Sequence, residues 1–413
     1  MQEEMEGRRL CLFSEGSELI PSCSRLTDEF ERGQVLSILG SLYGVRSLKS
    51  FPGASPVSLE RRNLLQVQQQ PYLVTLKSDG VRYILLLCVT RDGWGEDVHR
   101  ALFINRSLEM YECEVWANDT YFTTPTLFDG ELVWQNSSSG LQKMFLIFDA
   151  ISVRGSCKHL RLTERLNIVN RCVLTNVPED VRGKTEVLEQ FIMDEDKVFL
   201  HSCDTRMCPK RFVFLPDIRE LWDMHSRCSN KNDGLIFAVD DKVEMYTDRK
   251  MFKWKPRTCV TIDVEYNFAD GSVFVGRGGE TVPLSRVVVE EGKALTVRLQ
   301  ENEVIHCLRT SVSEESVVLE CLFQVQGSTL LLSPIKERSD KKGTPNQEAT
   351  VLGTIRNAHE DIRIEEIMRS LSDCDSVVEK RAAPSPPRRD EADDSRPVRR
   401  GTRRSKRVRS DDR

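Results

Sequence analysis

Short apolar stretches separated by polar turns run through residues 72–153, a pattern typical of β-strands. The first stretch, Tyr72 to Leu76, leads into the hexapeptide Lys77-Ser78-Asp79-Gly80-Val81-Arg82, and a second apolar run, Tyr83 to Val89, follows at once. An Asp-Gly pair between two strand-like segments predicts a hairpin or a sharp bend. We therefore expect Lys77 at the edge of a sheet, with buried residues around it. Further strands are predicted over 101–106, 124–134 and 143–153.

Lys77 has two interpretations. It can be an ordinary surface lysine whose aliphatic stem lies along apolar neighbours. It can equally be a desolvated amine with a lowered pKa that acts as a nucleophile. Lys-x-Asp-Gly is short enough to arise by chance, so the motif alone does not decide between them.

The second half of the chain changes its pattern twice. An acid, Asp233, stands at the mouth of a predicted strand over 232–237, and alternation over 251–255 puts Lys253 and Lys255 on one face of the next strand. Residues 257–335 are short β-rich segments at fairly regular spacing, typical of a small barrel such as an OB-fold. A helix is predicted over 348–371, and the polar residues 373–413, rich in Pro, Arg and Asp, predict disorder.

These patterns predict an α+β protein with two folded domains. The first domain is expected over residues 1–255, and an OB-fold β-barrel over 256–345. Residues 373–413 are expected to form a disordered basic tail.

The charge of the chain is unevenly distributed. The formal net charge is −5, yet residues 395–410 hold eight Arg or Lys and no acid, so the rest of the chain carries −13. A body that gripped nucleic acid along its length would be basic, so any polyanion that the body handles must be met by a local cluster of cations. No apolar run is long enough to cross a bilayer, and the acidic N-terminus lacks the apolar core of a signal peptide. The 13 scattered cysteines are interpreted as reduced thiols, so we expect an intracellular protein.

Several candidate residues fit phosphoryl-type transfer when they are taken together. Lys77 supplies a nucleophile, Glu131 and Asp233 are carboxylates on predicted strands, and Lys253 and Lys255 share a face. A further charged cluster, Arg338, Asp340 and Lys341, follows the predicted barrel. Carboxylates hold the hard ion Mg²⁺, and lysines stabilise the charge that develops on a phosphate. Taken singly, Glu131 can be an outward strand residue and Phe148 a core residue.

The order of these motifs resembles one family. The matching stretches are FPGASPVSL (51–59), KSDGVR (77–82), FINR (103–106), FDGELV (128–133), FLIFDAI (145–151), NDGLIF (232–237), KWKP (253–256) and KERSDKK (336–342). Together they look like an mRNA capping enzyme, specifically its GTP:RNA guanylyltransferase, within the lysine-dependent nucleotidyltransferases that also include polynucleotide ligases. The resemblance covers roughly residues 50–365. It implies a nucleotidyltransferase domain of the ligase and capping type, with an ATP-grasp-like fold, followed by the OB-fold domain. It also implies that the C-terminal helical segment 346–371 packs back on the first domain.

The resemblance also implies a role for each site residue. Lys77 would form a covalent phosphoramidate with GMP. Arg82 and Glu131 would hold the ribose, and Phe148 would stack on the guanine, whose O6 Lys210 would contact. Glu131 and Asp233 would hold Mg²⁺ or Mn²⁺. The remaining contacts to GTP are assigned to Arg106, to Lys253 and Lys255 at the α-phosphate, and to Arg338, Asp340 and Lys341 at the β- and γ-phosphates.

The implied partners are GTP and the 5′-diphosphate end of RNA. The sequence lacks the His-Cys-x5-Arg loop of a phosphatase and the glycine-rich fingerprint of a methyltransferase. We therefore expect a separate RNA triphosphatase and cap methyltransferase, with the transcription machinery as a further partner, no membrane, and a nuclear location.

Two alternative functions of the protein and three uses of its basic tail remain open at the level of the sequence. The protein can be an ATP-dependent RNA or DNA ligase, or a binding module without activity, although the intact lysines and carboxylates argue against the module. The basic tail can serve nuclear import, electrostatic capture of RNA, or no partner at all.

Overall fold

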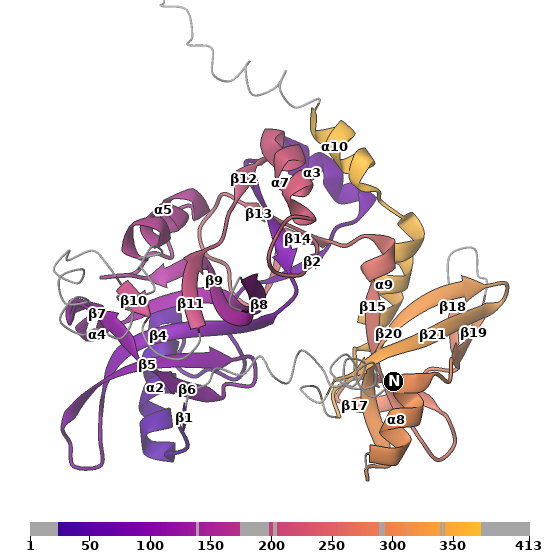
Figure 1. The fold of residues 1–413 in the computed structure, drawn as a ribbon, viewed down its shortest axis with the longest axis horizontal. Helices are drawn as coiled ribbons and strands as arrows, with labels where there is room; N and C mark the ends of the chain where they lie inside the picture. The colour runs from indigo at the N-terminus through magenta and orange to yellow at the C-terminus, as the bar shows by residue number, and fades with distance from the viewer. Residues whose placement is uncertain are drawn as a thin grey trace, which may run out of the picture. The chain divides into compact units, whose positions relative to one another are not determined.

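The computed structural model describes residues 24–137, 140–173, 198–200, 205–288, 294–311, 313–338, 341 and 343–372. Asp340 and the predicted tail, 373–413, lie outside these residues. The described chain is a mixed α/β fold with three larger sheets and one separate pair of strands (Figure 1). No helix in these ranges is long and apolar enough to cross a membrane.

The first sheet has seven strands in the order β1-β6-β5-β4-β8-β9-β11, antiparallel except for the pair β9–β11. They are β1 (Ser24–Arg25), β4 (Val81–Arg91), β5 (Asp97–Asn105), β6 (Met110–Cys113), β8 (Thr126–Ser137), β9 (Gly140–Ser152) and β11 (Thr205–Pro209). The elements near it are α2 (Glu29–Tyr43), α4 (Thr120–Thr123), α5 (Leu162–Cys172) and the pair β7 (Val115–Ala117) and β10 (Val198–Leu200).

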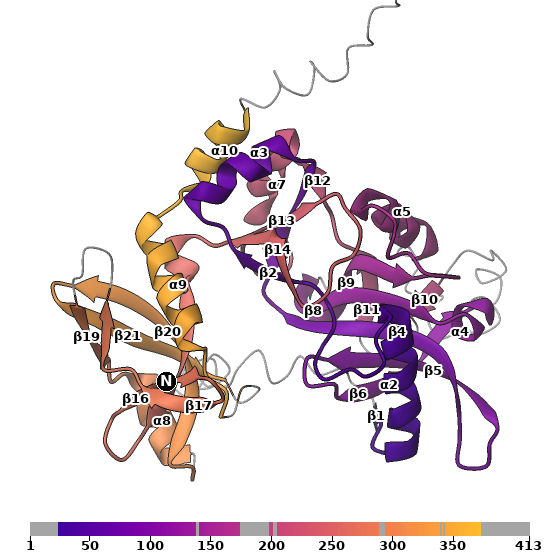
Figure 2. The same ribbon diagram turned by 180° about the vertical axis from the view of Figure 1, so that it is seen from behind.

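Strand β4 is an unbroken apolar run because both of its faces are buried. Tyr83, Leu85 and Leu87 pack in a core with α4 and α5 residues on one face of the sheet. Ile84, Leu86 and Cys88 pack on the other face, where helix α2 lies (Figure 2). A strand that is covered on both faces needs no polar alternation.

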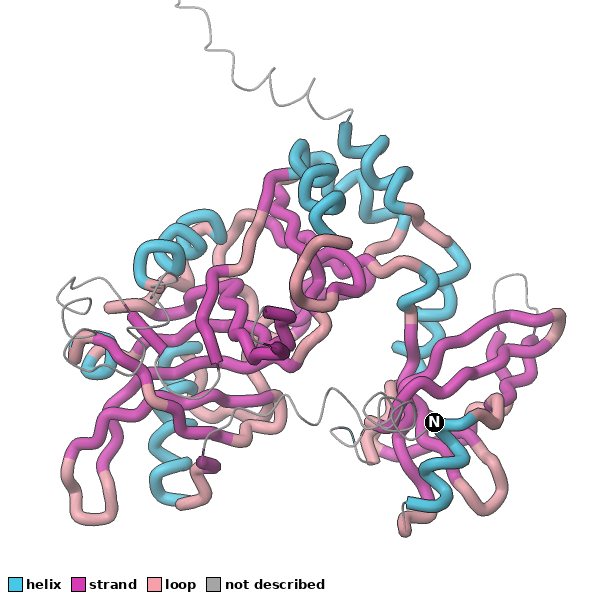
Figure 3. The backbone as a smooth tube through the Cα atoms, viewed as in Figure 1, coloured by secondary structure: helices cyan, strands magenta, loops and turns pink. Residues whose placement is uncertain are grey.

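The second sheet has five strands in the order β12-β3-β13-β14-β2. They are β2 (Ser55–Ser58), β3 (Tyr72–Ser78), β12 (Val213–Phe214), β13 (Asn232–Val239) and β14 (Thr247–Trp254). Its helical elements are η1 (Arg61–Asn63), α3 (Leu64–Gln69), η2 (Leu215–Asp217), α7 (Ile218–His225) and η3 (Arg257–Cys259). The helices α3 and α7 contribute to the same core as β3 and β13, and Figure 3 shows helices gathered on this part of the fold.

The structure decides between the two turns expected after Lys77 and shows where this lysine lies in its sheet. The segments on either side of Asp79-Gly80 do not pair as a hairpin, because β3 belongs to the five-stranded sheet and β4 to the seven-stranded sheet. The turn is therefore the sharp bend, and it carries the chain from one sheet to the other. Strand β3 lies between β13 and β12, but β12 pairs only with Leu73 and Val74, so at the level of Lys77 only β13 runs beside it. The sequence cannot show this, because β12 and β13 are more than 130 residues further along the chain.

The third sheet lies in the region predicted to be a barrel. Its seven strands follow the order β17-β16-β15-β20-β21-β19-β18. They are β15 (Thr261–Asn267), β16 (Val273–Arg277), β17 (Glu280–Pro283), β18 (Arg286–Val288), β19 (Ala294–Leu299), β20 (Ser316–Gln326) and β21 (Thr329–Glu337), with α8 (Glu303–Ser311) between β19 and β20. All seven strands begin within residues 257–335, the range predicted to be β-rich. We call this sheet with its helices α8 and α9 the C-terminal body.

The predicted helix over 348–371 is two helices, α9 (Glu348–Glu360) and α10 (Ile364–Ser372). Asp361 separates them in a left-handed conformation with φ of 43°, which ends a right-handed helix. Val351 and Ile355 of α9 pack in the core of the C-terminal body, whereas Ile367 and Met368 of α10 pack in the core of the five-stranded sheet.

Candidate active site

A cleft of about 870 Å³ draws residues from all three larger sheets. Every predicted site residue that the structure describes lines it: Lys77, Arg82, Arg106, Glu131, Phe148, Lys210, Asp233, Lys253, Lys255, Arg338 and Lys341. Asp340 lies outside the described residues. Eleven side chains spread over more than 260 positions of sequence are thus brought to one cavity.

The register of the five-stranded sheet places Lys77. On β3, the residues Val74 and Leu76 face the core, so the alternate positions Thr75 and Lys77 face the cleft. Ile236 pairs with Thr75 on one side and with Lys253 on the other. The wall that carries Lys77 therefore also carries Lys253.

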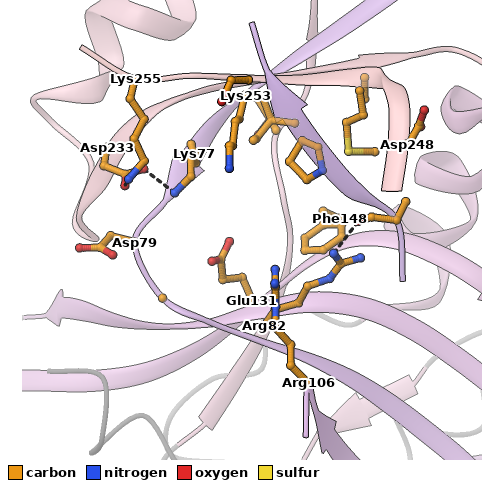
Figure 4. Close-up of a pocket in the computed structure, with 18 of the residues that line it drawn as sticks. Lys77, Asp79, Arg82, Arg106, Glu131, Phe148, Asp233, Asp248, Lys253 and Lys255 are labelled. Atoms are coloured by element: carbon orange, nitrogen blue, oxygen red, sulfur yellow. Dashed lines mark hydrogen bonds and ion pairs between the residues drawn. The ribbon is translucent and has the colours of Figure 1, made fainter. Parts of the chain in front are cut away.

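Asp233 reaches this wall through an irregularity in β13. The pairing of β13 with β3 shifts register between Asn232 and Leu235, and Gly234 has φ of 152°. A Cβ at Gly234 would collide with the carbonyl oxygen of Trp254, so the bulge requires glycine here. It lets Asp233 meet two cations: its Oδ1 accepts from Lys77 Nζ at 2.6 Å and its Oδ2 lies 2.6 Å from Lys255 Nζ (Figure 4).

The cations of the cleft differ in how firmly they hold their protons. Burial by itself lowers the pKa of Lys77, but the negative charges of Asp233 and Glu131 outweigh it, so the pKa of Lys77 is raised. Lys253 is half-buried, and burial together with repulsion from Lys77 and Lys255 lowers its pKa to about 8. The nucleotide-free site therefore holds Lys77 as an ammonium ion, contrary to the lowered pKa expected of a resting nucleophile.

Arg82 is enclosed on the seven-stranded sheet. Its Nε and Nη2 donate to the two oxygens of Asp129 at 2.9 and 2.5 Å, and its Nη1 donates to the carbonyl of Ala54 at 2.5 Å. The rings of Phe51 and Phe148 lie 5.1 and 5.2 Å from its guanidinium carbon. Asp129 is 2% exposed, so this is a buried, bidentate ion pair.

A bulge in β9 positions Phe148. Asp129 pairs with Asp149 and the next residue, Gly130, pairs with Ile147, so Phe148 has no partner on β8. It is only partly buried, and Lys210 Nζ lies 5.8 Å from the centre of its ring. The Lys210 side chain is 7% exposed and its ammonium is 3.7 Å from Glu131. An aromatic face with a buried cation near it suits a purine ring.

The C-terminal body supplies cations that its own acids orient. Arg338 Nη1 is 3.3 Å from both oxygens of Asp263 and 3.7 Å from Glu320. Lys341 Nζ is 2.5 Å from the same Asp263 carboxylate. Asp263 is 5% exposed, so it fixes both cations at the rim of the cleft.

The carboxylates of the cleft fit a divalent metal only in part. Within the described residues, no group of three or more His, Cys, Asp or Glu is arranged to hold a metal ion. Glu131 and Asp233 are hard oxygen ligands, and Mg²⁺ is commonly bound by one or two carboxylates together with water and substrate phosphates. The pair is therefore suited to a metal that arrives with a nucleotide.

Some residues of the site were missed by sequence reasoning. Asp129 stands two positions before Glu131 in an apolar strand, a visible signal, but its pairing with Arg82 depends on how β4 and β8 meet. Asp263 and Glu320 are acids inside the predicted strands of the barrel region, and only the folded sheet brings them to Arg338.

Comparison with known proteins shows which family the chain resembles. The family model described as "mRNA capping enzyme, catalytic domain" matches residues 20–257. The mRNA-capping enzyme subunit alpha of Schizosaccharomyces pombe is 26% identical over 359 residues, 81% of this chain and 83% of the relative. The corresponding Neurospora crassa subunit is 33% identical over 56% of each chain. The Mus musculus mRNA-capping enzyme is 25% identical over 62% of this chain, which spans only 42% of that relative.

Solved structures of ligases show a weaker likeness. The ATP-dependent DNA ligase of bacteriophage T7 in complex with ATP has a TM-score of 0.27 and 10% identity, over 69% of this chain and 98% of the ligase. The ligase domain of M. tuberculosis LigD has a TM-score of 0.26 and 14% identity, over 70% and 95%. We draw no conclusion from similarity at this level.

Proposed function

Because this chain belongs to the mRNA capping enzyme family through its catalytic domain, it is a guanylyltransferase, and we propose that the cleft transfers GMP from GTP to RNA through Lys77. The observation that carries the residue-level proposal is the wall on which Lys77, Lys253, Lys255 and Asp233 meet. A nucleophilic amine among phosphate-binding cations is what such a transfer requires.

The proposed reaction has two half-reactions at one phosphorus atom. In the first, Lys77 Nζ, as the free amine, forms a bond to the α-phosphorus of GTP. The bond from that phosphorus to the bridging oxygen breaks, pyrophosphate leaves with the electron pair, and the attacking nitrogen releases a proton to solvent. In the second, a terminal oxygen of the 5′-diphosphate RNA end attacks the same phosphorus. The N–P bond breaks, the GpppN cap is released and Lys77 takes up a proton again.

Before the first half-reaction, Lys77 must lose a proton. In the nucleotide-free site its ammonium is paired with Asp233 at 2.6 Å, and Lys255 contacts the other oxygen of that carboxylate. Withdrawing negative charge from Asp233 favours the amine, because the carboxylate is what raises the pKa of Lys77. Lys255 and a cation bound at Asp233 both act in this direction.

We propose that Glu131 and Asp233 hold Mg²⁺ or Mn²⁺ together with the phosphates of GTP. When bound, such an ion supplies positive charge that stabilises the phosphate oxygens during transfer. Lys253 and Lys255 would bind the α-phosphate, and Arg338 and Lys341 the β- and γ-phosphates. We assign Asp340 to the same group from its place in the motif alone.

The remaining contacts hold the nucleoside. Phe148 offers its ring to the guanine, and Lys210, buried beside that ring, is a donor for the guanine O6. Arg82 and Glu131 face each other across β4 and β8, which supports their shared role at the ribose. Arg106 is exposed at the end of β5 and lines the cleft, where it would reach the phosphates.

The wider setting is also a proposal. A nucleotidyltransferase domain of the ligase and capping type followed by an OB-fold domain accounts for the order of the three larger sheets. The names of the fungal relatives include the words "subunit alpha", which supports partner subunits. We propose that RNA triphosphatase and cap methyltransferase activities come from other polypeptides, that the transcription machinery is a further partner, and that the protein works in the nucleus.

Labelling tests the function directly. Protein incubated with radioactive GTP and a divalent cation should keep the label after denaturation, whereas ATP should give none; label from ATP alone would support a ligase. The adduct should be stable in alkali and labile in acid, as an N–P bond is. Lys77→Ala and Lys77→Arg should both lower labelling at least a thousandfold, because arginine stays protonated and cannot attack. Appreciable adduct in Lys77→Arg would rule out this nucleophile.

A further inference from the structure

Tyr43, the last residue of helix α2, ends at the cleft without a hydrogen bond. Its side chain is 4% exposed, and its hydroxyl is buried with no hydrogen-bond partner in the described part of the chain. Tyr43 nevertheless lines the same cleft as Arg82, Asp129 and Asp149. A buried hydroxyl without a partner is costly to keep, so its presence beside a substrate cavity needs an explanation.

The surroundings of this hydroxyl are unusually polar for a protein interior. Arg82 and Asp129 form one bidentate pair, and Arg165 forms another with Asp149 at 2.6 and 3.0 Å. Burial raises the pKa of Tyr43 well above its ordinary value, and the charge of Asp129 raises it further. The hydroxyl therefore keeps its proton and is available as a donor.

The enclosure of Arg82 creates a difficulty for its role at the ribose. Its side chain is only 8% exposed, two phenyl rings lie within 5.2 Å of its guanidinium carbon, and three of its five N–H donors are in use. Gly53 also lies close by, where a Cβ would lie only 2.5 Å from Arg82 Nη2 and 2.7 Å from Asp129 Oδ2. Arg82 can therefore meet a ribose only by moving, and any movement takes donors away from Asp129.

We propose that Tyr43 is a positioning residue for the nucleotide: when Arg82 turns toward the ribose of GTP, the Tyr43 hydroxyl donates to the Asp129 carboxylate in its place. This inference rests on the proposed contact between Arg82 and the ribose. Asp129 is buried and its pKa is already raised by that burial, so a carboxylate left without donors would oppose the movement of Arg82. The hydroxyl that has no partner in the nucleotide-free protein gains one in the complex.

The proposal predicts opposite effects of one substitution on folding and on binding. Tyr43→Phe removes only the hydroxyl, which makes no hydrogen bond in the nucleotide-free protein, so its melting temperature should stay the same or rise. The KM for GTP in enzyme–GMP formation should rise about three- to tenfold, the effect of one hydrogen bond. The rate at saturating GTP should not change, because the reacting phosphate lies at Lys77.

Thr205→Val is the matched control. Its hydroxyl is also buried without a partner in the described chain, but Thr205 does not line the cleft. This variant should leave the KM for GTP unchanged. An equal rise of KM in both variants would overturn the proposal, because it would trace the effect to the loss of any buried hydroxyl.

Nucleotide analogues separate this inference from the function it rests on. Wild-type protein is compared with 2′-deoxy-GTP and 3′-deoxy-GTP, and the analogue that raises KM identifies the hydroxyl that Arg82 holds. With that analogue, the KM of Tyr43→Phe should be less than twofold higher than the KM of the wild-type protein. A full three- to tenfold cost would overturn the proposal. If neither analogue raises the KM of the wild-type protein, Arg82 does not bind the ribose and this inference is wrong. Covalent labelling by GTP would still support guanylyl transfer in that case.

Discussion

At the residue scale, the resting site favours the protonated nucleophile. Asp233 joins Lys77 to Lys255 through its two oxygens, and its own pKa is lowered because those two cations outweigh the effect of burial. The pKa of Lys77 is raised in the nucleotide-free protein, which favours its ammonium form. Reaction depends on charge that arrives with the substrate.

Lys253 makes the pH dependence of the first half-reaction testable. The amine fraction of Lys77 grows tenfold per pH unit below its raised pKa, whereas Lys253 loses its charge as the pH rises through about 8. Since kcat/KM reports the free enzyme, log kcat/KM for enzyme–GMP formation should rise with unit slope up to about pH 8 and flatten above it. In Lys253→Arg, which stays charged, the rise should continue past pH 8, at a lower absolute rate.

Rate measurements between about pH 6.5 and 9.5 check this expectation. A break that stays near pH 8 in Lys253→Arg would assign the titration to another group. Lys250→Arg is a suitable control, because Lys250 lies on the same strand β14 but is paired with Asp241 outside the set of predicted phosphate contacts.

The sequence predicted most of the site but not its supports. Lys77, Glu131, Asp233, Lys253 and Lys255 were chosen from motif and alternation, and all line one cleft. Each of their motifs is a short run of consecutive residues, so it can be recognised from the sequence alone. The partners that hold Arg82 and Arg338 are set by pairing between strands far apart in the chain, and Tyr43 stands in a helix with no motif at all.

At the element scale, local pattern left the form of the turn at Asp79-Gly80 open, and it predicted one helix over 348–371 where the structure has two. A hairpin and a bend between two sheets have the same turn signal, because the difference lies in which strands pair with β3 and β4. Helix periodicity likewise continues across Asp361, although the two halves face different cores. The hydrophobic pattern of a sequence indicates which residues are buried but not which elements of the fold bury them.

Helix α10 should contribute strongly to the stability of the five-stranded sheet. Ile367 is fully buried in that core, and Trp254 Nε1 donates to the carbonyl of Ile362 just before the helix at 2.8 Å. Ile367→Ala should lower the free energy of unfolding by about 2–5 kcal/mol, from lost burial and the cavity left behind. Ile335→Ala, at a position 40% exposed on β21, should cost about 1 kcal/mol or less. Urea denaturation followed by tryptophan fluorescence measures both; equal losses would show that α10 does not support the sheet.

At the scale of the whole molecule, the two half-reactions should depend differently on the C-terminal body. Arg338 and Lys341 are the cations proposed for the β- and γ-phosphates, and pyrophosphate has left before RNA reacts. Arg338→Ala and Lys341→Ala should therefore slow enzyme–GMP formation by about tenfold or more, yet change transfer from isolated enzyme–GMP to RNA by less than about threefold.

Arg277→Ala is the control for these two variants, because Arg277 lies on the same sheet but pairs with Glu348 on the surface. Single-turnover assays of each half-reaction give the comparison. A similar loss in both half-reactions would contradict the assignment of Arg338 and Lys341 to the leaving pyrophosphate.

Removal of residues 375–413 separates the proposed uses of the basic tail. All described site residues precede the cut, so enzyme–GMP formation should be unchanged. If the tail captures RNA, truncation should raise the KM for RNA and flatten its dependence on salt, since the eight cations of 395–410 release counterions on binding. If it serves import alone, kinetics should be unchanged while the tagged protein moves to the cytoplasm. Loss of the enzyme–GMP adduct itself would place part of the catalytic fold within the removed residues.

The position of α10 has a consequence for how the protein is made. The core of the five-stranded sheet uses residues from Leu59 to Trp254 and then Ile362 to Leu371, so the ribosome must first synthesise the whole C-terminal body, which lies between them in the sequence. At about 5–20 residues per second, that interval is on the order of ten seconds. Throughout it, the nascent catalytic sheet exposes the apolar surface that α10 later covers. This interval is when a chaperone would be needed, and when the growing chain is most exposed to aggregation.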